Sequence, residues 1–210
     1  MGLRESQRRH TIGLIVAAAT DVFGQRGYHG TSMEDVAKAT GCATATLYGY
    51  FPSKEALFTH VLGELITAYL DGVRTAVEAT TTYEAGVRAY FAHFLDFAES
   101  RQAFLRVMLA VMRSAQPGTT PAAESADAFR AAYFALLSPV LARAVDEGRL
   151  PAVTDLEPLV GLLTGVLHTA SYPWLLDATY DLRPAILSAR ALFLAGAPAA
   201  AAQLASGAPE

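Results

Sequence analysis

The stretch that decides the fold is TSMEDVAKATGCATATLYGYFPSKEAL, residues 31–57. Thr31 and Glu34 have the Thr-x-x-Glu spacing of a capping box, which predicts a helix that begins after Thr31. Gly41 ends this helix at a tight turn, and a second short helix is expected over about 43–50. Two short helices joined by a glycine turn are typical of a helix-turn-helix, whose second helix has the right length to lie in a major groove.

The sequence on both sides of this stretch is also predicted to be helical, because apolar residues recur there at three-and-four spacing. Gly27 suits a left-handed helix end, and Ser53 is placed to cap the helix after the quoted stretch. Pro173 is expected to kink or break the helix that contains it. The expected helices run over about 6–26, 53–70, 82–99, 101–112, 121–148, 155–178 and 181–195. With no convincing strand, the chain is predicted to be all-α.

We predict three parts along the chain. Residues 1–52 form a helix-turn-helix DNA-binding domain, and residues 53–197 form a helical bundle for ligand binding and dimerisation. Residues 198–210, where Ala, Pro, Ser and Gly dominate, are expected to form a disordered tail. The net charge is −4, but residues 1–60 carry +1 and the remaining 150 residues −5, so the N-terminal part tolerates a polyanion best.

Composition and motifs argue against several other classes of protein. One cysteine excludes an internal disulfide framework, and no stretch reaches the roughly 18 uninterrupted apolar residues of a membrane span, so a cytoplasmic protein without a membrane partner is expected. The five histidines lack metal-ligand spacing, and no His-Glu-x-x-His, phosphate loop or nucleophile elbow is present. We therefore expect neither an enzyme nor a cofactor or metal. A helical ligand-binding protein that has lost DNA binding is the other alternative.

Several short motifs together resemble the DNA-binding domain of the TetR family of bacterial transcriptional regulators. The resemblance covers about residues 8–60 and rests on Gly27-Tyr28, residues 31–37, Gly41, residues 46–48, Tyr50-Phe51 and residues 53–57. It implies a homodimer that binds double-stranded palindromic operator DNA, usually as a repressor. It also implies a small-molecule effector that binds in the C-terminal bundle and controls release.

The resemblance assigns the DNA contact to Thr31, Ser32, Thr44, Ala45, Thr46, Tyr48, Tyr50 and Lys54. Residues 44–46 would face the bases, and the others would contact phosphates, the first two at a helix N-terminus. Because residues 44–46 cannot make bidentate contacts, base reading would rest on hydroxyls and on methyl contacts with thymine. Three arginines, at positions 4, 8 and 9, are expected to precede the first helix and to reach phosphate or the minor groove.

Two positions depart from the family pattern. Ala43 stands where the family usually has a capping serine, and Gly49 lies inside the short second helix; each costs about 1 kcal/mol of helix stability. We therefore expect a recognition helix that orders fully only on DNA. Phe51 and Cys42 are expected to be buried, whereas Tyr48 is expected to contact phosphate, with a core position as the alternative.

The C-terminal bundle is rich in aromatic residues and methionine, most of which should fill the core. A few polar groups within these apolar segments are typical of an apolar ligand site with orienting groups. The candidate ligand residues are Arg88, Phe91, His93, Phe94, Met108, Met112, Phe129, Tyr133, His168, Tyr172 and Trp174. We expect an apolar, uncharged or weakly charged effector, and a two-fold dimer formed by the helices at about 155–178 and 181–195.

Overall fold

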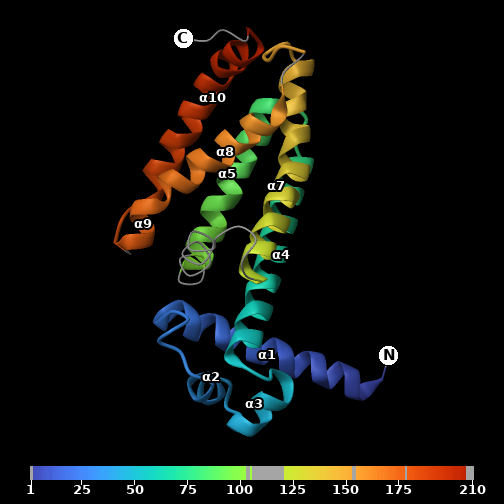
Figure 1. Ribbon diagram of the computed structural model, residues 1–210, viewed down its shortest axis with the longest axis vertical. Coiled ribbons are helices and arrows are strands. Elements are labelled where there is room, and N and C mark those ends of the chain that lie inside the picture. Colours follow the sequence, from blue (N-terminus) through green and yellow to red (C-terminus); the bar gives the residue numbers. More distant parts are fainter. Residues whose placement is uncertain (1, 103–104, 106–120, 153–154, 178, 207–210) are drawn as a thin grey trace. The chain divides into compact units, whose positions relative to one another are not determined.

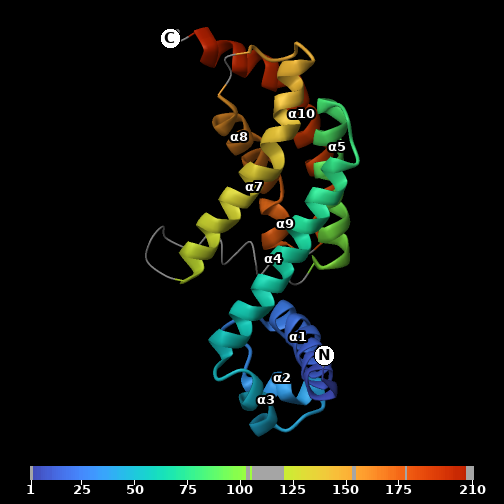
Figure 2. The same cartoon turned by 90° about the vertical axis from the view of Figure 1, so that its right-hand side faces the viewer.

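The computed structural model describes residues 2–102, 105, 121–152, 155–177 and 179–206, without the side chains of 3, 121–130, 175 and 200–206. Every regular element in these residues is a helix, which confirms the predicted all-α fold (Figures 1 and 2). The helices are α1 (Leu3–Arg26), α2 (Met33–Thr40), α3 (Thr44–Tyr50), α4 (Lys54–Glu78), α5 (Tyr83–Ser100), α7 (Pro121–Asp146), α8 (Leu156–Ala170), α9 (Tyr172–Leu176) and α10 (Leu182–Ser206). They form two units: an N-terminal unit of Met1–Ala68 with Ser100–Ala123, and a C-terminal unit of Tyr69–Glu99 with Glu124–Glu210.

The core of the N-terminal unit joins α1, α2, α3 and the first turns of α4. Phe23 of α1 packs edge-on against Phe58 of α4, with their ring centroids 5.0 Å apart. Fully buried side chains from each helix complete this core, namely Ile15, Ala19, Val36, Leu47 and Leu57. The predicted turn is present, because Gly41 has a left-handed φ of 74° and the next amide, that of Cys42, donates to the Ala37 carbonyl at 3.0 Å.

The capping box that begins α2 lies one residue later than the sequence predicted. Ser32, not Thr31, is the N-cap: its Oγ accepts from the Asp35 amide at 3.1 Å, and the Asp35 carboxylate accepts from the Ser32 amide at 3.0 Å. Thr31 is buried, and its hydroxyl donates to the Gly27 carbonyl at 2.8 Å. Tertiary burial of Thr31 therefore decides between two overlapping capping patterns, Thr-x-x-Glu and Ser-x-x-Asp.

Lys54, at the start of α4, ties together the chain between α1 and α2. Its ammonium donates to the carbonyls of Tyr28 and Thr31, both at 2.9 Å, and lies 4.5 Å from the centroid of the Tyr28 ring. Two loop residues, His29 and Gly30, separate the two accepting carbonyls, so one charged group fixes the loop that leads into α2. These are charge-assisted hydrogen bonds and a cation–π contact at a half-buried site.

The C-terminal unit is built around α5, whose buried face carries several aromatic rings. Its first amide, that of Tyr83, donates to the Glu147 carboxylate beyond the end of α7 at 2.7 Å, and Arg143 of α7 donates to the Thr80 hydroxyl at 2.9 Å. α8 and α10 pack on each other through one face each, with Leu159, Leu163, Leu167, Ile186 and Phe193 buried. As predicted, the chain breaks at Pro173: α8 ends at Ala170, and Pro173 lies in the first turn of α9.

Three helix termini differ from the sequence-based prediction. α1 begins at Leu3, so Arg4, Arg8 and Arg9 lie within the first helix and do not precede it. The sequence of residues 154–157 has the Thr-x-x-Glu spacing of a capping box, but the N-cap of α8 is Asp155, whose carboxylate accepts from the Glu157 amide at 3.0 Å. α10 continues through Pro198 to Ser206, beyond the expected helix end at about 195 and into the stretch expected to be disordered, because the alanines after Pro198 favour helix. The predicted helix over 101–112 falls mostly outside the described residues, and the predicted domain boundary between 52 and 53 stays a prediction.

None of the described helices is long and apolar enough to cross a membrane.

The Lys54 contacts predict a loss of stability when the ammonium is removed. Lys54→Met keeps the aliphatic stem but leaves the two carbonyls without their charged donor, so we expect the free energy of unfolding to fall by about 1–3 kcal/mol. Urea denaturation followed by circular dichroism measures this change. The chain's only other lysine, Lys38, is exposed on α2, so Lys38→Met is the matched control. Equal stability of the two variants would contradict the structural role of Lys54.

Candidate nucleic-acid interface and effector site

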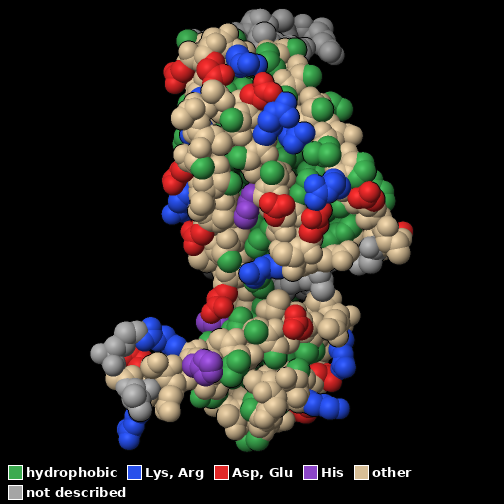
Figure 3. Space-filling model, turned by 180° about the vertical axis from the view of Figure 1, so that it is seen from behind, with side chains coloured by type: hydrophobic (Ala, Val, Ile, Leu, Met, Phe, Trp, Pro, Cys, Tyr) green, Lys and Arg blue, Asp and Glu red, His purple; other side chains and the backbone are tan. Residues whose placement is uncertain are grey.

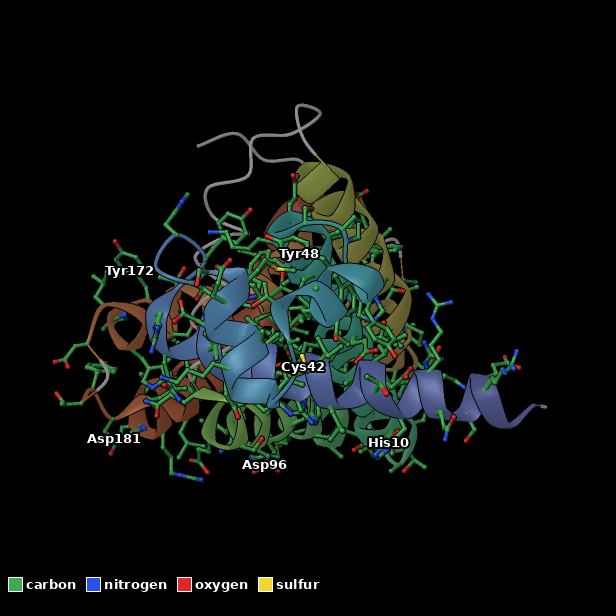
Figure 4. All side chains as sticks on the ribbon, turned by 90° about the horizontal axis from the view of Figure 1, so that it is seen from below. His10, Cys42, Tyr48, Asp96, Tyr172 and Asp181 are labelled. Carbon is green, nitrogen blue, oxygen red and sulfur yellow. The ribbon has the colours of Figure 1, made fainter. Side chains whose placement is uncertain are left out.

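The recognition helix α3 is anchored by one residue and presents the rest of its surface. Leu47 is fully buried, whereas Ala45, Thr46 and Tyr48 are exposed, Tyr48 to 47%. This exposure rules out the alternative that Tyr48 is a core aromatic. Figure 4 views the N-terminal unit from the side of α2 and α3 and labels Tyr48 there. The face next to Leu47 is thus fixed in the core, and the opposite face is free to meet a partner.

The first turn of α3 lacks a side-chain cap, as its sequence predicted. Ala43 is the N-cap residue and makes no side-chain hydrogen bond; its carbonyl accepts from Thr46 at 2.9 Å and from Leu47 at 3.2 Å. Thr44 and Tyr50 are half-buried. Phe51 is buried, as expected, with its ring 5.2 Å from that of His60. Cys42 is half-buried and not fully buried, because it lies on the turn between α2 and α3.

The N-terminus of α2 offers less to a phosphate than the sequence implied. The hydroxyls of Thr31 and Ser32 are both used within the fold, the first on the Gly27 carbonyl and the second in the capping box. The hydrogen bond from the Ser32 hydroxyl holds the pKa of Asp35 below its ordinary value, and Arg26, 2.6 Å away, lowers it further. The first-turn amides that the box leaves, those of Met33 and Glu34, are the remaining donors at this end.

The N-terminal end of α1 and the last residue of α3 line an open hollow of about 770 Å³, which we call the α1 hollow. Its lining is polar and includes two arginines: Arg4, Ser6, Gln7, Arg8, His10, Thr11 and Tyr50. Figure 3 shows basic side chains gathered at this projecting end of α1, at the lower left. Among the described residues neither arginine forms an ion pair, so both guanidinium groups are available to an anion. The sequence prediction named Tyr50 and the arginines but not the polar residues between them.

In the C-terminal unit, three helices bring tyrosine rings together in an otherwise apolar core. Tyr69 of α4, Tyr90 of α5 and Tyr133 of α7 are all buried, and we call them the tyrosine cluster. The Tyr133 ring lies 5.9 Å from Tyr69 and 6.0 Å from Tyr90. Burial raises the pKa of all three phenols well above the ordinary value, so each keeps its proton at neutral pH.

Two histidines border the tyrosine cluster. The His93 ring lies 5.3 Å from Tyr69, and the His168 ring lies 6.4 Å from Tyr133. Burial lowers the pKa of both imidazoles, so both are neutral at pH 7. His93 Nε2 lies 3.1 Å from the Tyr69 carbonyl. A Cβ on Gly72 would come within 2.6 Å of that nitrogen, so the glycine permits this close approach.

The other predicted ligand residues are divided by the structure. Phe91, Phe94 and Trp174 are buried in the C-terminal unit, as core residues or pocket walls would be. Arg88 is exposed and forms a 2.7 Å ion pair with Glu84, so it does not enter the core. Tyr172 is also largely exposed, at 41%. Three further candidates, Met108, Met112 and the side chain of Phe129, lie outside the described residues.

The sequence prediction missed Tyr69 and Tyr90. Tyr90 recurs at helical spacing with Val87, Phe91 and Phe94, so the pattern does not distinguish it from a core aromatic, and no candidate was expected in the helix over about 53–70. A phenol at a core position carries a polar group that needs a partner, and that signal was available from the sequence. No group of three His, Cys, Asp or Glu side chains in the described ranges is arranged to hold a metal ion.

Comparison with known proteins gives its strongest matches in the N-terminal unit. The family model described as bacterial regulatory proteins, tetR family, matches residues 15–61. The HTH-type transcriptional activator FasR of Mycolicibacterium smegmatis is 37% identical over 87 residues, 41% of this chain and 40% of that protein. The regulator RutR of Escherichia coli K12 is 34% identical over 100 residues, 46% of this chain and 47% of that protein. The chain thus matches less than half the length of these two relatives.

Other likenesses extend through the C-terminal unit. The fatty acid metabolism regulator protein of Bacillus subtilis is 23% identical over 181 residues, 84% of this chain and 90% of that protein. The crystal structure of the transcriptional regulator FadR from Bacillus subtilis in complex with stearoyl-CoA has a TM-score of 0.76 at 19% identity, covering 87% of this chain and 97% of that one. That likeness shows a shared fold. Residues 15–61 thus carry the helix-turn-helix of the tetR family of bacterial regulatory proteins, and the chain as a whole shares the fold of a solved transcriptional regulator.

Proposed function

We propose that this chain is a transcriptional repressor that binds a palindromic operator as a homodimer and leaves it when a small apolar effector binds the C-terminal unit. The observation that carries the proposal is the exposed face of α3, with Ala45, Thr46 and Tyr48 free on a helix that Leu47 anchors from behind. In a helix-turn-helix, this is the face that enters the major groove.

The proposed DNA contact divides into base reading and phosphate binding. Residues 44–46 would read bases through two hydroxyls and three methyl groups, so specificity also depends on half-site spacing and DNA shape. Tyr48 would donate its exposed hydroxyl to a phosphate, while Tyr50, Arg4 and Arg8 would bind phosphate through the α1 hollow. Ser32 and Thr31 would act indirectly, by holding the first-turn amides of α2 in place.

Lys54 was predicted to contact phosphate directly, and the structure gives it a second task. Two of its three donor positions are directed to the Tyr28 and Thr31 carbonyls, which leaves one proton for a phosphate. We propose that it does both, as a charged contact and as the group that positions α2.

The proposed dimer would use the outer faces of α8 and α10. Large apolar side chains stand exposed there: Leu162 at 48%, Leu187 at 37% and Leu192 at 73%. Gly161 and Gly165 are four residues apart and therefore lie on the same side of α8. A Cβ at either position would meet nothing within 4 Å, so this side is open to a partner helix. A self-complementary helix pair on a second copy would cover these leucines around a two-fold axis.

The effector half of the proposal is supported by the aromatic core of the C-terminal unit and by its relatives. One relative is described as a fatty acid metabolism regulator, and FadR of similar fold was solved with stearoyl-CoA. We therefore propose an effector with a long acyl chain.

Transcriptional activation is the second candidate function, because FasR is described as a transcriptional activator. A reporter gene placed behind the selected operator separates the two, since a repressor lowers and an activator raises expression.

Two variants separate neutral from charged phosphate contacts. Tyr48→Phe deletes a neutral hydrogen bond, so we expect weaker operator binding with an unchanged slope of log K against log salt. Arg8→Ala removes a cation, so we expect the slope to shrink by roughly one contact per subunit. Fluorescence anisotropy across a salt series measures both on an operator selected from random DNA. Arg74→Ala, an exposed arginine of the C-terminal unit, is the charge-matched control. Parental behaviour of both test variants would refute the proposed DNA contact.

Base reading makes a different prediction. Thr46→Val keeps size and one methyl but loses the hydroxyl, so we expect the preferred operator to change at individual base pairs by about 1–3 kcal/mol each. Affinity for random duplex should stay the same, because no phosphate contact is lost. Repeating the operator selection with this variant provides the measurement. An identical selected sequence would show that Thr46 does not read bases.

The dimer proposal predicts dissociation when charge is placed on its apolar face. Leu192→Glu should give monomers at micromolar concentration, because two carboxylates would be buried near the two-fold axis. Leu14→Glu, which changes an exposed leucine of α1, should leave the dimer intact. Sedimentation velocity measures both. A Leu192→Glu dimer as stable as the parent's would place the interface elsewhere.

A further inference from the structure

The tyrosine cluster is a polar site in the core that the overall proposal does not yet explain. We propose that the Tyr90 hydroxyl donates a hydrogen bond to a neutral carbonyl oxygen of the effector, such as that of an ester, thioester or ketone, and that the site thereby rejects a free carboxylate. This inference rests on the proposed effector site in the C-terminal unit and names the functional group that it recognises.

The Tyr90 hydroxyl is buried without a hydrogen-bond acceptor in the described residues. Tyr90 is 0% exposed, and within the described part of the chain no group meets its hydroxyl with hydrogen-bond geometry, although the Tyr69 and Tyr133 hydroxyls are near enough to affect its pKa. A buried donor without an acceptor is unfavourable, because the hydrogen bond that it made to water is lost on folding and not replaced. A ligand oxygen that accepts from this hydroxyl recovers that interaction, so the site gains most from a ligand that brings an acceptor.

The tyrosine cluster has no positive charge beside it in the described side chains. Arg74, Arg88, Arg149 and Arg183 of the C-terminal unit are exposed, the half-buried Arg143 donates to the Thr80 hydroxyl, and the half-buried Arg190 lies on α10, which carries none of the cluster residues. The two histidines beside the cluster are neutral at pH 7, because burial lowers the pKa of each. A carboxylate placed here would be a buried charge without a counter-charge, which is strongly unfavourable.

The phenol groups of the tyrosine cluster lie close together, and an apolar side chain lies beside them. Tyr69, Tyr90 and Tyr133 come from three helices, and the Tyr133 ring contacts both of the others. The Phe97 ring lies 5.0 Å from Tyr69, which supplies an apolar neighbour for the hydrocarbon part of a ligand. Protonated phenols that donate, with no acceptor-only group among them, suit a carbonyl oxygen, which can only accept.

Matched ligands and matched variants test the inference on the full-length protein. The probes are dodecanoate and hexadecanoate, their methyl esters, and the methyl ketones of the same lengths. Tyr90→Phe removes the donor and keeps the ring. Tyr83→Phe is the control, because Tyr83 also lies on α5 with a buried hydroxyl that has no partner in the described residues. Affinity is read by calorimetry and by the shift in melting temperature, which rises with ligand binding.

A second readout separates hydrogen bonding from packing. The infrared carbonyl stretch of a ¹³C-labelled methyl ester should move to lower frequency when the ester binds the parent, because its oxygen accepts a hydrogen bond. That shift should be kept in Tyr83→Phe and lost in Tyr90→Phe. Ligand-free Tyr90→Phe should melt no lower than the parent, since its hydroxyl has no partner to lose.

We expect the parent to bind esters and ketones about tenfold more tightly than carboxylates, and Tyr90→Phe to lose that preference. Equal binding of carboxylates and esters, or an unchanged preference and carbonyl shift in Tyr90→Phe, would overturn the inference while leaving an acyl effector in place. Binding of no probe at all, with the operator results intact, would overturn the effector half of the proposed function together with this inference.

Discussion

The arrangement of α2 and α3 in the N-terminal unit depends on the hydrogen bonds donated by the Lys54 ammonium. The ammonium lies where α4 begins, and it donates to the Tyr28 and Thr31 carbonyls of the loop between α1 and α2. Holding that loop fixes Thr31 in the core, and Thr31 in turn places Ser32 at the N-cap of α2. The left-handed Gly41 then sets the direction of α3. The exposed face of α3 is thus positioned by one half-buried charge contact behind it.

Much of this arrangement could be predicted from local sequence, and the exceptions share a cause. The turn at Gly41, the uncapped start of α3 and the break at Pro173 each depend on a few adjacent residues, so the sequence predicted them correctly. The choice between Thr31 and Ser32 as the cap could not be made locally, since each has an acidic residue three positions later. Contacts between distant segments decided it, and such contacts leave no local pattern.

The candidate sites show the same division. Exposed positions of α3 follow from helical periodicity once Leu47 is known to be buried. The tyrosine cluster instead joins residues 69, 90 and 133, and only the packing of three helices brings them together. Arg88 illustrates the converse error, because a polar residue inside an apolar segment was assigned to the pocket although its ion pair with Glu84 holds it at the surface. The role of a polar residue in an amphipathic helix can therefore be assigned only when its neighbours in the folded structure are known.

The small side chains on the exposed face of α3 have a consequence for how this regulator and its targets change over generations. In the proposed DNA contact, the half-buried Thr44 and the exposed Ala45 and Thr46 offer the bases no long charged group, so no single base becomes indispensable. A single mutation in a target promoter then alters occupancy by degrees instead of abolishing it. Promoters can consequently be gained or lost from the regulated set in small steps, and a substitution in α3 can follow them without an intermediate that binds nothing.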